Sequence, residues 1–353
     1  MKQVIFIGWI SKGSVPAVGE TVKNQYIIEE LKKYCEVIEL DFYQKKRHPW
    51  IYLQTIWTFI RYPQASIILS TSAKNVYTML RVMKGLGIRR NIIHWVVGGA
   101  FSNLIKNKVF DVEVFNYVTY NLVQCHGMVT QLVDAGMRNA KYVVNFKKIN
   151  YYPSLEKCLD RRKNVDVIKF VYAGRIHPDK GCEYIFDAVE KLNKQGFASK
   201  YIVDFYGPFG RLEEAYRNTF FSKIEKYDNV DYKGVLNFRE NHGYDLLSSY
   251  HALLFPTHWQ SEGIAGIFID SFIAALPVIT SDWGFNTECI TDGVQGVVFP
   301  YQDIDQFVNI MKGFIEGKYD LQNMAICARE EASKYDAENA LTKDYLKSIG
   351  LVD

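Results

Sequence analysis

The sequence predicts an α/β protein with two domains, each built around a parallel β-sheet. Short apolar runs alternate with segments of helical periodicity along almost the whole chain, which is typical of βαβ units. A chain of 353 residues also exceeds one comfortable hydrophobic core, so two domains are expected. The alternation is interrupted at residues 147–166, which contain Pro153 and a charged run at 160–163. This interruption predicts an interdomain linker.

The first half contains five apolar runs that are expected to form strands, with helices between them. They are residues 4–7, 37–40, 67–69, 92–97 and 142–144. Residues 20–34 have helical spacing, which brings Tyr26, Ile27, Leu31 and Tyr34 to one face. The apolar and aromatic segment 51–60 is also expected to be a helix. It either packs inward or lies as an amphipathic helix against a membrane.

The second half restarts the same pattern after the linker. Its expected strands are residues 168–173, 201–206, 230–232, 252–255, 278–280 and 296–299. The predicted domains are residues 1–160 and 161–336, followed by a terminal segment, 337–353, that contains a last helix at 337–348.

Charge is distributed unevenly between the two halves. The net charge is +3, but residues 1–160 contain 21 Lys and Arg against 11 Asp and Glu, whereas the remainder contains 21 against 28. A basic first half suits an anionic lipid surface or a polyprenyl-phosphate-linked acceptor, and ordinary solvated lysines are the alternative. Nucleic acid is not an expected partner, because the only dense basic cluster, at 45–48, lacks a recognition motif.

Several protein classes are excluded by what the sequence lacks. No window reaches the roughly eighteen apolar residues of a membrane span. Six dispersed cysteines without a C-x-x-C pair argue against a disulfide framework and a zinc site, and fit a reducing cytoplasm. Neither G-x-G-x-x-G nor G-x4-G-K-[ST] is present, which argues against a dinucleotide oxidoreductase and a P-loop nucleotidase. The expected location is the cytoplasm, either free or at the inner face of the membrane.

The stretch 253–300 carries the strongest chemical signal. An apolar strand ends at Pro256, a helix containing Asp270 follows, and Glu262 lies in the loop between them. The rest of this loop is Gly263, Ile264, Ala265 and Gly266. Parallel sheets bind ligands at the carboxyl ends of their strands, where glycines let backbone N–H groups approach an anion. Two carboxylates beside an anion site suit a ligand with both phosphates and hydroxyls, such as a nucleotide-sugar.

A second signal follows the predicted strand 168–173. Arg175 and Lys180 are five residues apart in the next loop, with Gly174 and Gly181 beside them. Two cations at the carboxyl end of a strand can hold a diphosphate and neutralise the charge that develops as it leaves. Neither this loop nor the stretch 253–300 contains a D-x-D motif to hold a metal ion at a nucleotide-sugar, so this pair is expected to do that work. A solvated loop with scattered charge is the alternative.

These two blocks resemble the retaining GT-B glycosyltransferases of glycosyltransferase family 4. Glu262 and Asp270 are similar to that family's E-x7-E signature, with Asp in place of the second Glu, and residues 174–181 resemble its vGR-x4-KG segment. The resemblance covers the second half well and the first half weakly. It implies two Rossmann-like domains that face a cleft, a terminal helix that crosses back to the first domain, and sugar transfer with retention of configuration.

The resemblance also implies roles in the second half, with Arg175, Lys180 and Glu262 as catalytic residues. Glu262 would accept hydrogen bonds from the donor sugar and Asp270 from the ribose diol, and a helix-surface carboxylate is the alternative for Asp270. Gly207 and Val235 resemble positions beside the nucleotide, or else lie in plain turns.

In the first half, two glycine-bearing loops resemble loops that face the diphosphate and the acceptor. One is marked by Gly13 and Gly19, the other by Gly98 and Gly99, and connecting loops are the alternative. His94 precedes the second loop, but its place in a strand is more typical of a core histidine than of a catalytic group.

The resemblance implies an enzyme that moves a sugar from a nucleotide-sugar to a hydroxyl on a glycan or lipid-linked acceptor, without metal or other cofactor. The wording EGIAGIFIDSF is similar to bacterial members that build surface polysaccharides such as capsules. Two alternatives remain open: a nucleotide-sugar 2-epimerase of the same fold, and a catalytically silent partner subunit that binds a nucleotide-sugar.

Overall fold

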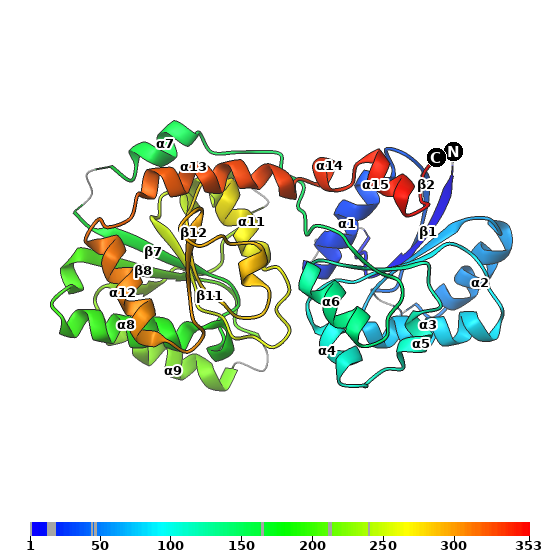
Figure 1. Ribbon diagram of the computed structural model, residues 1–353, viewed down its shortest axis with the longest axis horizontal. Coiled ribbons are helices and arrows are strands. Elements are labelled where there is room, and N and C mark those ends of the chain that lie inside the picture. The colour runs from blue at the N-terminus through cyan, green and yellow to red at the C-terminus, as the bar shows by residue number, and fades with distance from the viewer. Residues whose placement is uncertain are drawn as a thin grey trace. The chain divides into compact units, whose positions relative to one another are not determined.

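The chain folds into two compact units, each described by itself. This computed structural model describes residues 2–353 apart from 13–18, 44, 46, 47, 164, 165, 211–213, 239 and 240. The units are Met1–Lys148 with Lys334–Asp353, and Ile149–Ser333, so the second unit begins inside the predicted linker and ahead of residue 160. Within the described residues, each unit contains one six-stranded parallel sheet, which confirms the predicted α/β class (Figure 1).

The sheet of the first unit has the strand order β2-β1-β3-β4-β5-β6. Its strands are β1 Gln3–Gly8, β2 Glu36–Asp41, β3 Ser66–Ser70, β4 Ile92–Trp95, β5 Tyr120–Val123 and β6 Ala140–Tyr142. Its helices are α1 Gly19–Leu31, α2 Ile51–Arg61, α3 Ala73–Gly85, α4 Ala100–Lys106, α5 Val112–Phe115, α6 His126–Asp134, α14 Ala337–Ala340 and α15 Lys343–Ser348. The predicted strand 92–97 is shorter in the structure, since β4 ends at Trp95. The predicted strand 142–144 lies two residues earlier, since β6 ends at Tyr142.

The core of the first unit joins α1, the sheet and the end of the chain. Ile27 and Leu31 of α1 are buried with Phe6 of β1 and Leu346 of α15, as the helical spacing of residues 20–34 predicts. The predicted last helix is two short helices, because the chain breaks at Thr342, whose hydroxyl caps α15 by accepting from the Tyr345 N–H at 3.2 Å.

Strand β5 is the one strand of this sheet that the sequence pattern does not indicate. Its apolar run is interrupted by Asn121, a residue depleted in strands. Asn121 is nevertheless fully buried, because its amide donates to the Phe115 carbonyl at 3.0 Å and to the Asn139 side-chain oxygen at 2.8 Å. Hydrogen bonds between distant residues therefore compensate for burying the amide.

The sheet of the second unit has the order β12-β11-β10-β7-β8-β9. Its strands are β7 Ile168–Ala173, β8 Tyr201–Tyr206, β9 Val230–Tyr232, β10 Ala252–Phe255, β11 Val278–Ser281 and β12 Gly296–Phe299. All but β11, which is one residue longer, have the predicted bounds. Its helices are α7 Leu155–Asp160, α8 Cys182–Lys194, α9 Glu214–Glu225, α10 Asn241–Leu247, α11 Gly266–Ile273, α12 Ile304–Ile315 and α13 Leu321–Ala332.

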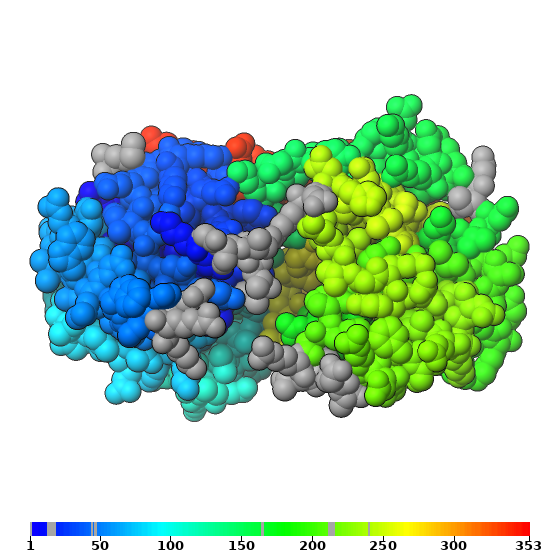
Figure 2. All heavy atoms as spheres, turned by 180° about the vertical axis from the view of Figure 1, so that it is seen from behind, coloured from blue at the N-terminus to red at the C-terminus, as the bar shows by residue number. Residues whose placement is uncertain are grey.

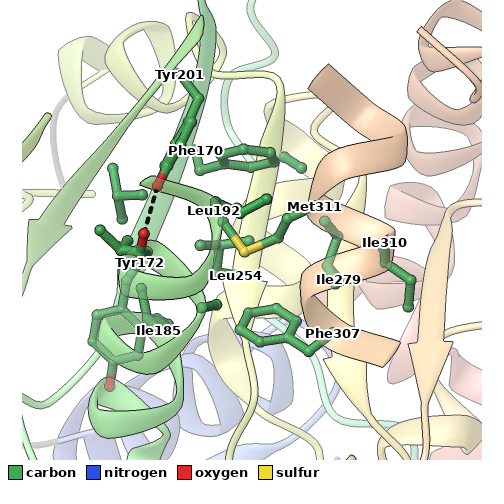
Figure 3. Packing of buried hydrophobic residues seen from close by; sticks show 14 of the residues in the cluster. Phe170, Tyr172, Ile185, Leu192, Tyr201, Leu254, Ile279, Phe307, Ile310 and Met311 are labelled. Carbon is green, nitrogen blue, oxygen red and sulfur yellow. Dashed lines mark hydrogen bonds between the residues drawn. The ribbon is translucent and has the colours of Figure 1, made fainter. Parts of the chain in front are cut away.

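Helices cover both faces of the second sheet. On one face, Leu192 of α8 and Met311 of α12 pack against Phe170, Leu254 and Ile279 of three neighbouring strands (Figure 3). Helix α11 lies on the other face with α13 beside it (Figure 1). Strands that are buried on both faces read as unbroken apolar runs, which is why the sequence indicates them so well.

The charged run at 160–163 belongs to the second unit rather than to an open linker. Arg162 is 7% exposed, and its guanidinium donates to the carbonyls of Tyr250 at 2.6 Å, Ala275 at 2.6 Å and Ser248 at 3.0 Å. These carbonyls lie just after α10 and α11, where helix ends lack partners and favour a cation. Burial lowers the pKa of Arg162 to about 10.

Candidate active site

The predicted residues of the second half gather at the carboxyl ends of β7 and β10. These two strands are neighbours in the sheet, although the chain visits β8 and β9 between them, so the strand order reverses at this point. Such a topological switch point is where open α/β sheets bind ligands. β7 leads into Gly174 and Arg175, and β10 leads into the loop that carries Glu262.

A pocket of about 240 Å³ opens at this edge of the sheet. Its lining includes Gly174, Arg175, Gly207, Val235 and Asp270, all of which are predicted site residues. Apolar side chains of Leu236, Phe238 and Ile267 complete much of its wall. Apolar walls with a few converging polar groups suit an organic ligand that carries a ring and hydroxyls.

The loops after β7 and β8 meet at Gly207, beside the pocket. Gly207 has a φ of 152°, and a Cβ there would lie 1.6 Å from the Gly174 carbonyl oxygen, so a larger residue does not fit. The Gly174 N–H donates to the Tyr206 carbonyl at 2.9 Å, and the Gly207 N–H donates to the Gly234 carbonyl at 2.8 Å. The backbone segments at Gly174 and Gly207 are therefore closely packed at the rim of the pocket. The alternative for Gly207 in the sequence analysis was a plain turn.

Asp270 faces the pocket from α11. It is 3% exposed, not on the helix surface, and it accepts a hydrogen bond from the Tyr244 hydroxyl at 3.2 Å. The loop of residues 263–266 lies directly before α11, whose cap residue Ala265 has no side-chain hydrogen bond to the helix. The first N–H groups of α11 carry the partial positive charge of a helix end, so this region can receive an anion.

Lys180 and Glu262 form a partly buried ion pair. Lys180 ends the short 3₁₀ helix η1 (Pro178–Lys180), and its ammonium donates to the Glu262 carboxylate. Their side chains are only 15% and 11% exposed, so salt screens the pair less than a surface pair. The Thr257 hydroxyl donates to the same carboxylate at 3.3 Å.

The indole ring of Trp259 joins the two predicted cations. The Arg175 guanidinium carbon lies 5.8 Å from the ring centroid, and the Lys180 ammonium lies 5.3 Å from it. The backbone N–H of Trp259 donates to the Thr257 hydroxyl at 3.2 Å, and its backbone carbonyl accepts from the Trp283 indole N–H at 2.9 Å. Arg175 and Lys180 thus converge on the Trp259 ring, and Glu262 joins them through its ion pair with Lys180.

Gly181 makes this convergence sterically feasible. Its φ is 88°, a left-handed conformation, and a Cβ would lie 2.3 Å from the Pro256 carbonyl oxygen. The chain after η1 can therefore lie directly against the end of β10. This contact sets Lys180 opposite the loop that carries Glu262.

The candidates of the first half lie in the first unit. Gly13 lies outside the described residues. Gly19 is the exposed first residue of α1, and a Cβ at this position would have no neighbouring atom within 4 Å. Gly98 has a φ of 90°, and Gly99 precedes α4 as its cap, so both lie just after β4. Their predicted roles at the diphosphate and acceptor remain predictions.

His94 has the environment of a core residue. It is buried and stacked on Phe115, and its Nδ1 lies 2.8 Å from the Asn121 side-chain oxygen. Burial lowers the pKa of His94 to about 4. The core interpretation of this histidine is therefore favoured.

The sequence prediction of the site does not include Thr257, Trp259 or Tyr244. Thr257 and Trp259 connect the cations to Glu262, and Tyr244 holds Asp270. The tryptophan could have been found, since it lies three residues before Glu262 in the loop that follows β10. No comparable signal marks Tyr244, which comes from α10.

Two negative findings concern the described part of the chain. No group of three or more His, Cys, Asp or Glu there is arranged to hold a metal ion. No helix there combines the length and apolar character needed to cross a bilayer.

The second unit matches a known enzyme family. Residues 159–331 fit the model of the family "Glycosyl transferases group 1". This match spans nearly all of the second unit and includes every candidate residue of the site described above.

Solved structures define the fold of the whole chain as GT-B. HepE of Anabaena, crystallised with UDP, has a TM-score of 0.70 at 16% identity, covering 99% of this chain and 100% of its own. Sucrose-phosphate synthase of Thermosynechococcus elongatus has a TM-score of 0.71 at 14% identity, covering 99% and 98%. The lipopolysaccharide outer core galactosyltransferase WaaB has a TM-score of 0.67 at 15% identity, covering 96% of both chains. Together with the family match, this fold supports a glycosyltransferase.

One curated protein is related in sequence. The "Uncharacterized 41.2 kDa protein in cps region" of Klebsiella pneumoniae is 26% identical over 184 residues. The aligned part is 51% of this chain and 47% of the relative, so the chain spans about half the length of that protein.

Proposed function

We propose that this chain is a glycosyltransferase that moves a sugar from a nucleoside-diphosphate donor to a hydroxyl acceptor with retention of configuration. The observation that carries the proposal is the convergence of Arg175 and Lys180 on Trp259, with Glu262 paired to Lys180, beside the pocket at the switch point. The family match supports sugar transfer. HepE was crystallised with UDP and with UDP-glucose, which supports a nucleotide-sugar donor.

In this proposal the pocket receives the nucleoside. Its apolar wall and Val235 lie against the base, and the buried Asp270 carboxylate accepts hydrogen bonds from the ribose diol. Gly174 and Gly207 leave room for the phosphates because neither carries a side chain. The loop 263–266 and the first turn of α11 supply N–H groups to the same anion.

The two cations hold the diphosphate. Glu262 neutralises Lys180 in the ligand-free chain, whereas a bound diphosphate gives Lys180 a second anionic partner. The Glu262 oxygens can then accept hydrogen bonds from the donor sugar. Arg175, which is exposed at the pocket, contacts the diphosphate from the other side.

The chemical step exchanges one bond of the anomeric carbon. Its bond to the phosphate oxygen breaks, a bond to the acceptor oxygen forms on the same face, and the acceptor proton passes to the departing phosphate oxygen. Arg175 and Lys180 neutralise the charge that develops on that phosphate. The step therefore needs no protein nucleophile, no metal ion and no other cofactor.

The proposed biological role is the assembly of a bacterial surface polysaccharide or glycolipid. The relative from a cps region supports this role, as does the similarity of residues 262–272 to enzymes that build such polymers. The acceptor is then a glycan or a lipid-linked sugar, and the enzyme works in the cytoplasm at the inner face of the membrane. The loops of Gly19, Gly98 and Gly99 are the proposed acceptor side.

The test begins with the donor. A panel of nucleotide-sugars is screened for thermal stabilisation, because a ligand that binds the native state raises its melting temperature. Transfer from the best donor is then measured for Arg175→Ala and Lys180→Ala. Each should lower kcat at least about tenfold, because each removes a charge that stabilises the leaving group. Lys200→Ala, at an exposed position in the same unit, should leave kcat unchanged.

Three results would contradict the proposal in different ways. Unchanged kcat in both variants would remove the diphosphate-binding role of the cations. Turnover of the donor without any acceptor would indicate the epimerase. Stabilisation by a nucleotide-sugar without turnover, over a wide range of acceptors, would indicate the silent subunit.

A further inference from the structure

Helix α2 directs its apolar side chains outward. Leu53, Trp57 and Ile60 are 71%, 61% and 73% exposed, whereas only Ile51 and Thr58 of this helix are buried. Of the two alternatives for segment 51–60, inward packing therefore fails for most of its apolar side chains. Residues 50–61 lie on the surface of the first unit, in the medium-blue region at the left of Figure 2.

These side chains form one continuous apolar surface, the α2 face. It consists of Leu53, Ile56, Trp57 and Ile60 of α2, Val82 of α3, and Leu86, which directly follows α3, and all six are exposed. The four α2 residues are three or four positions apart and therefore share one side of the helix. Ile56, Val82 and Leu86 also line a common pocket of about 320 Å³ between the two helices, which makes the surface continuous.

Contacts on the inner side keep α2 in this orientation. The Arg90 guanidinium donates to the carbonyls of Phe59 at 2.8 Å and Tyr62 at 3.0 Å, at the C-terminal end of the helix. It also lies 5.3 Å from the Phe59 ring. The buried Thr58 side chain lies on the same inner side. The outward position of the apolar residues is thus part of the fold. An apolar surface of this kind is unfavourable in contact with water, which indicates that it binds a partner.

The sequence segment that carries the α2 face is basic. Residues 42–110 contain 11 Lys and Arg and no Asp or Glu. Arg61, Lys74, Arg81, Lys84 and Arg89 among them have exposed side chains. Arg81 and Lys84 are on α3 next to Val82, which is part of the face. An apolar helix surface bordered by lysine and arginine is the chemistry of interfacial helices that bind anionic lipid.

We propose that the α2 face binds the surface of an anionic phospholipid bilayer. The helix lies in the plane of the membrane, its apolar residues enter the boundary between headgroups and acyl chains, and the basic residues around it pair with lipid phosphates. A second copy of this chain is a poor occupant, because two such faces would bring their bordering lysines and arginines together. Two acids close to α2, Glu39 and Asp41, lie with Ile51 and Gln54 at the start of the helix. The face shares no residue with the proposed donor site, so it can be tested separately.

The test measures cosedimentation of the full chain with two kinds of vesicle: phosphatidylcholine alone, and an equimolar mixture with phosphatidylglycerol. The wild-type chain should bind the anionic vesicles, and binding should weaken at high salt, which screens the charges. Trp57→Ser with Ile60→Ser should bind at least about tenfold more weakly, because it removes the deepest apolar contacts. Val133→Ser with Val294→Ser changes exposed apolar residues elsewhere and should bind like the wild type.

A second pair of variants tests the charges. Arg81→Glu with Lys84→Glu should also weaken binding at least about tenfold, whereas Lys200→Glu with Lys343→Glu, equally exposed but outside the region, should weaken it less. Circular dichroism checks that each variant is folded. Equal binding to both kinds of vesicle, no binding to either, or wild-type binding by the Trp57 and Ile60 variant would overturn the proposal. So would dimerisation that these substitutions abolish without any vesicle binding.

Discussion

Asp270 differs by one methylene from the glutamate that the E-x7-E pattern places at its position. A shorter carboxylate reaches less far into a pocket, so its surroundings decide whether it can still contact a ligand. Here the Tyr244 hydroxyl donates to Asp270 at 3.2 Å and the carboxylate lines the pocket. The remaining acceptor capacity of this carboxylate can serve a diol.

Replacing Asp270 should therefore weaken nucleotide binding. We expect Asp270→Ala to raise the Kd of the nucleotide by about tenfold or more, which is the effect of losing a hydrogen bond to a charged group, about 1.5–3 kcal/mol. Isothermal titration calorimetry measures this change. Tyr244→Phe removes the neighbouring hydrogen bond but keeps the carboxylate, and should have a smaller effect. A loss of stability without a change in Kd would show that Asp270 is purely structural.

At the scale of elements, the ends of strands and helices decide where the charged groups meet. Lys180 is held at the end of η1, and Glu262 follows β10, so their contact depends on how closely these two segments approach. Gly181 permits this approach by its left-handed φ and by the absence of a Cβ near Pro256.

Gly181→Ala should cost more stability than a matched glycine substitution. Gly317 also has a left-handed φ, but no atom lies within 4 Å of its built Cβ. We expect Gly317→Ala to lower the free energy of unfolding by about 1–2 kcal/mol from backbone strain alone. Gly181→Ala should lower it further, because its Cβ would overlap the Pro256 carbonyl, and it should also lower kcat. Urea unfolding measures both variants, and equal losses would contradict the close approach.

Helices α1 and α2 show what periodicity leaves undecided at this scale. Both have apolar residues at helical spacing, yet Ile27 and Leu31 of α1 are buried while Leu53 and Ile60 of α2 are exposed. Helical spacing of apolar residues indicates that a helix has an apolar face, but it does not indicate what that face packs against. The direction of the face depends on contacts with neighbouring segments. Arg90, for example, donates to the Phe59 carbonyl at the end of α2.

At the scale of the whole molecule, both units contain a histidine that is buried in its uncharged form. Burial lowers the pKa of His94 in the first unit and of His251 in the second unit to about 4, against 6.5 as the ordinary value. Between these two pH values the unfolded chain binds protons that the native chain does not. The free energy of unfolding should therefore fall as the pH falls from 6.5 to 4.

His251→Asn should make this pH dependence shallower. The asparagine oxygen can replace Nδ1, which accepts from the Lys169 N–H at 2.9 Å, but it does not titrate. Urea unfolding at several pH values between 4 and 6.5 measures the slope for wild type and variant. Identical slopes for His251→Asn and the wild type would contradict the assignment.

Much of the second unit follows from its sequence, because its strands are buried on both faces and read as continuous apolar runs. The resemblance predicts that Arg175, Lys180 and Glu262 act together, and each follows a predicted strand whose carboxyl end faces the ligand edge of a parallel sheet. Tyr244, which donates to Asp270, could not be assigned from spacing, and Arg162 reads as an ordinary charge although it is buried.

By itself, the sequence determined the alternation of strands and helices, the two sheets and the charged residues that follow particular strands, because these depend on local patterns. Only the tertiary structure decided that β7 and β10 are neighbours, that Tyr244 reaches Asp270 and that α2 faces outward. The physical reason is that such contacts join residues far apart in the chain, and their partners are chosen by packing over the whole unit rather than by neighbouring residues.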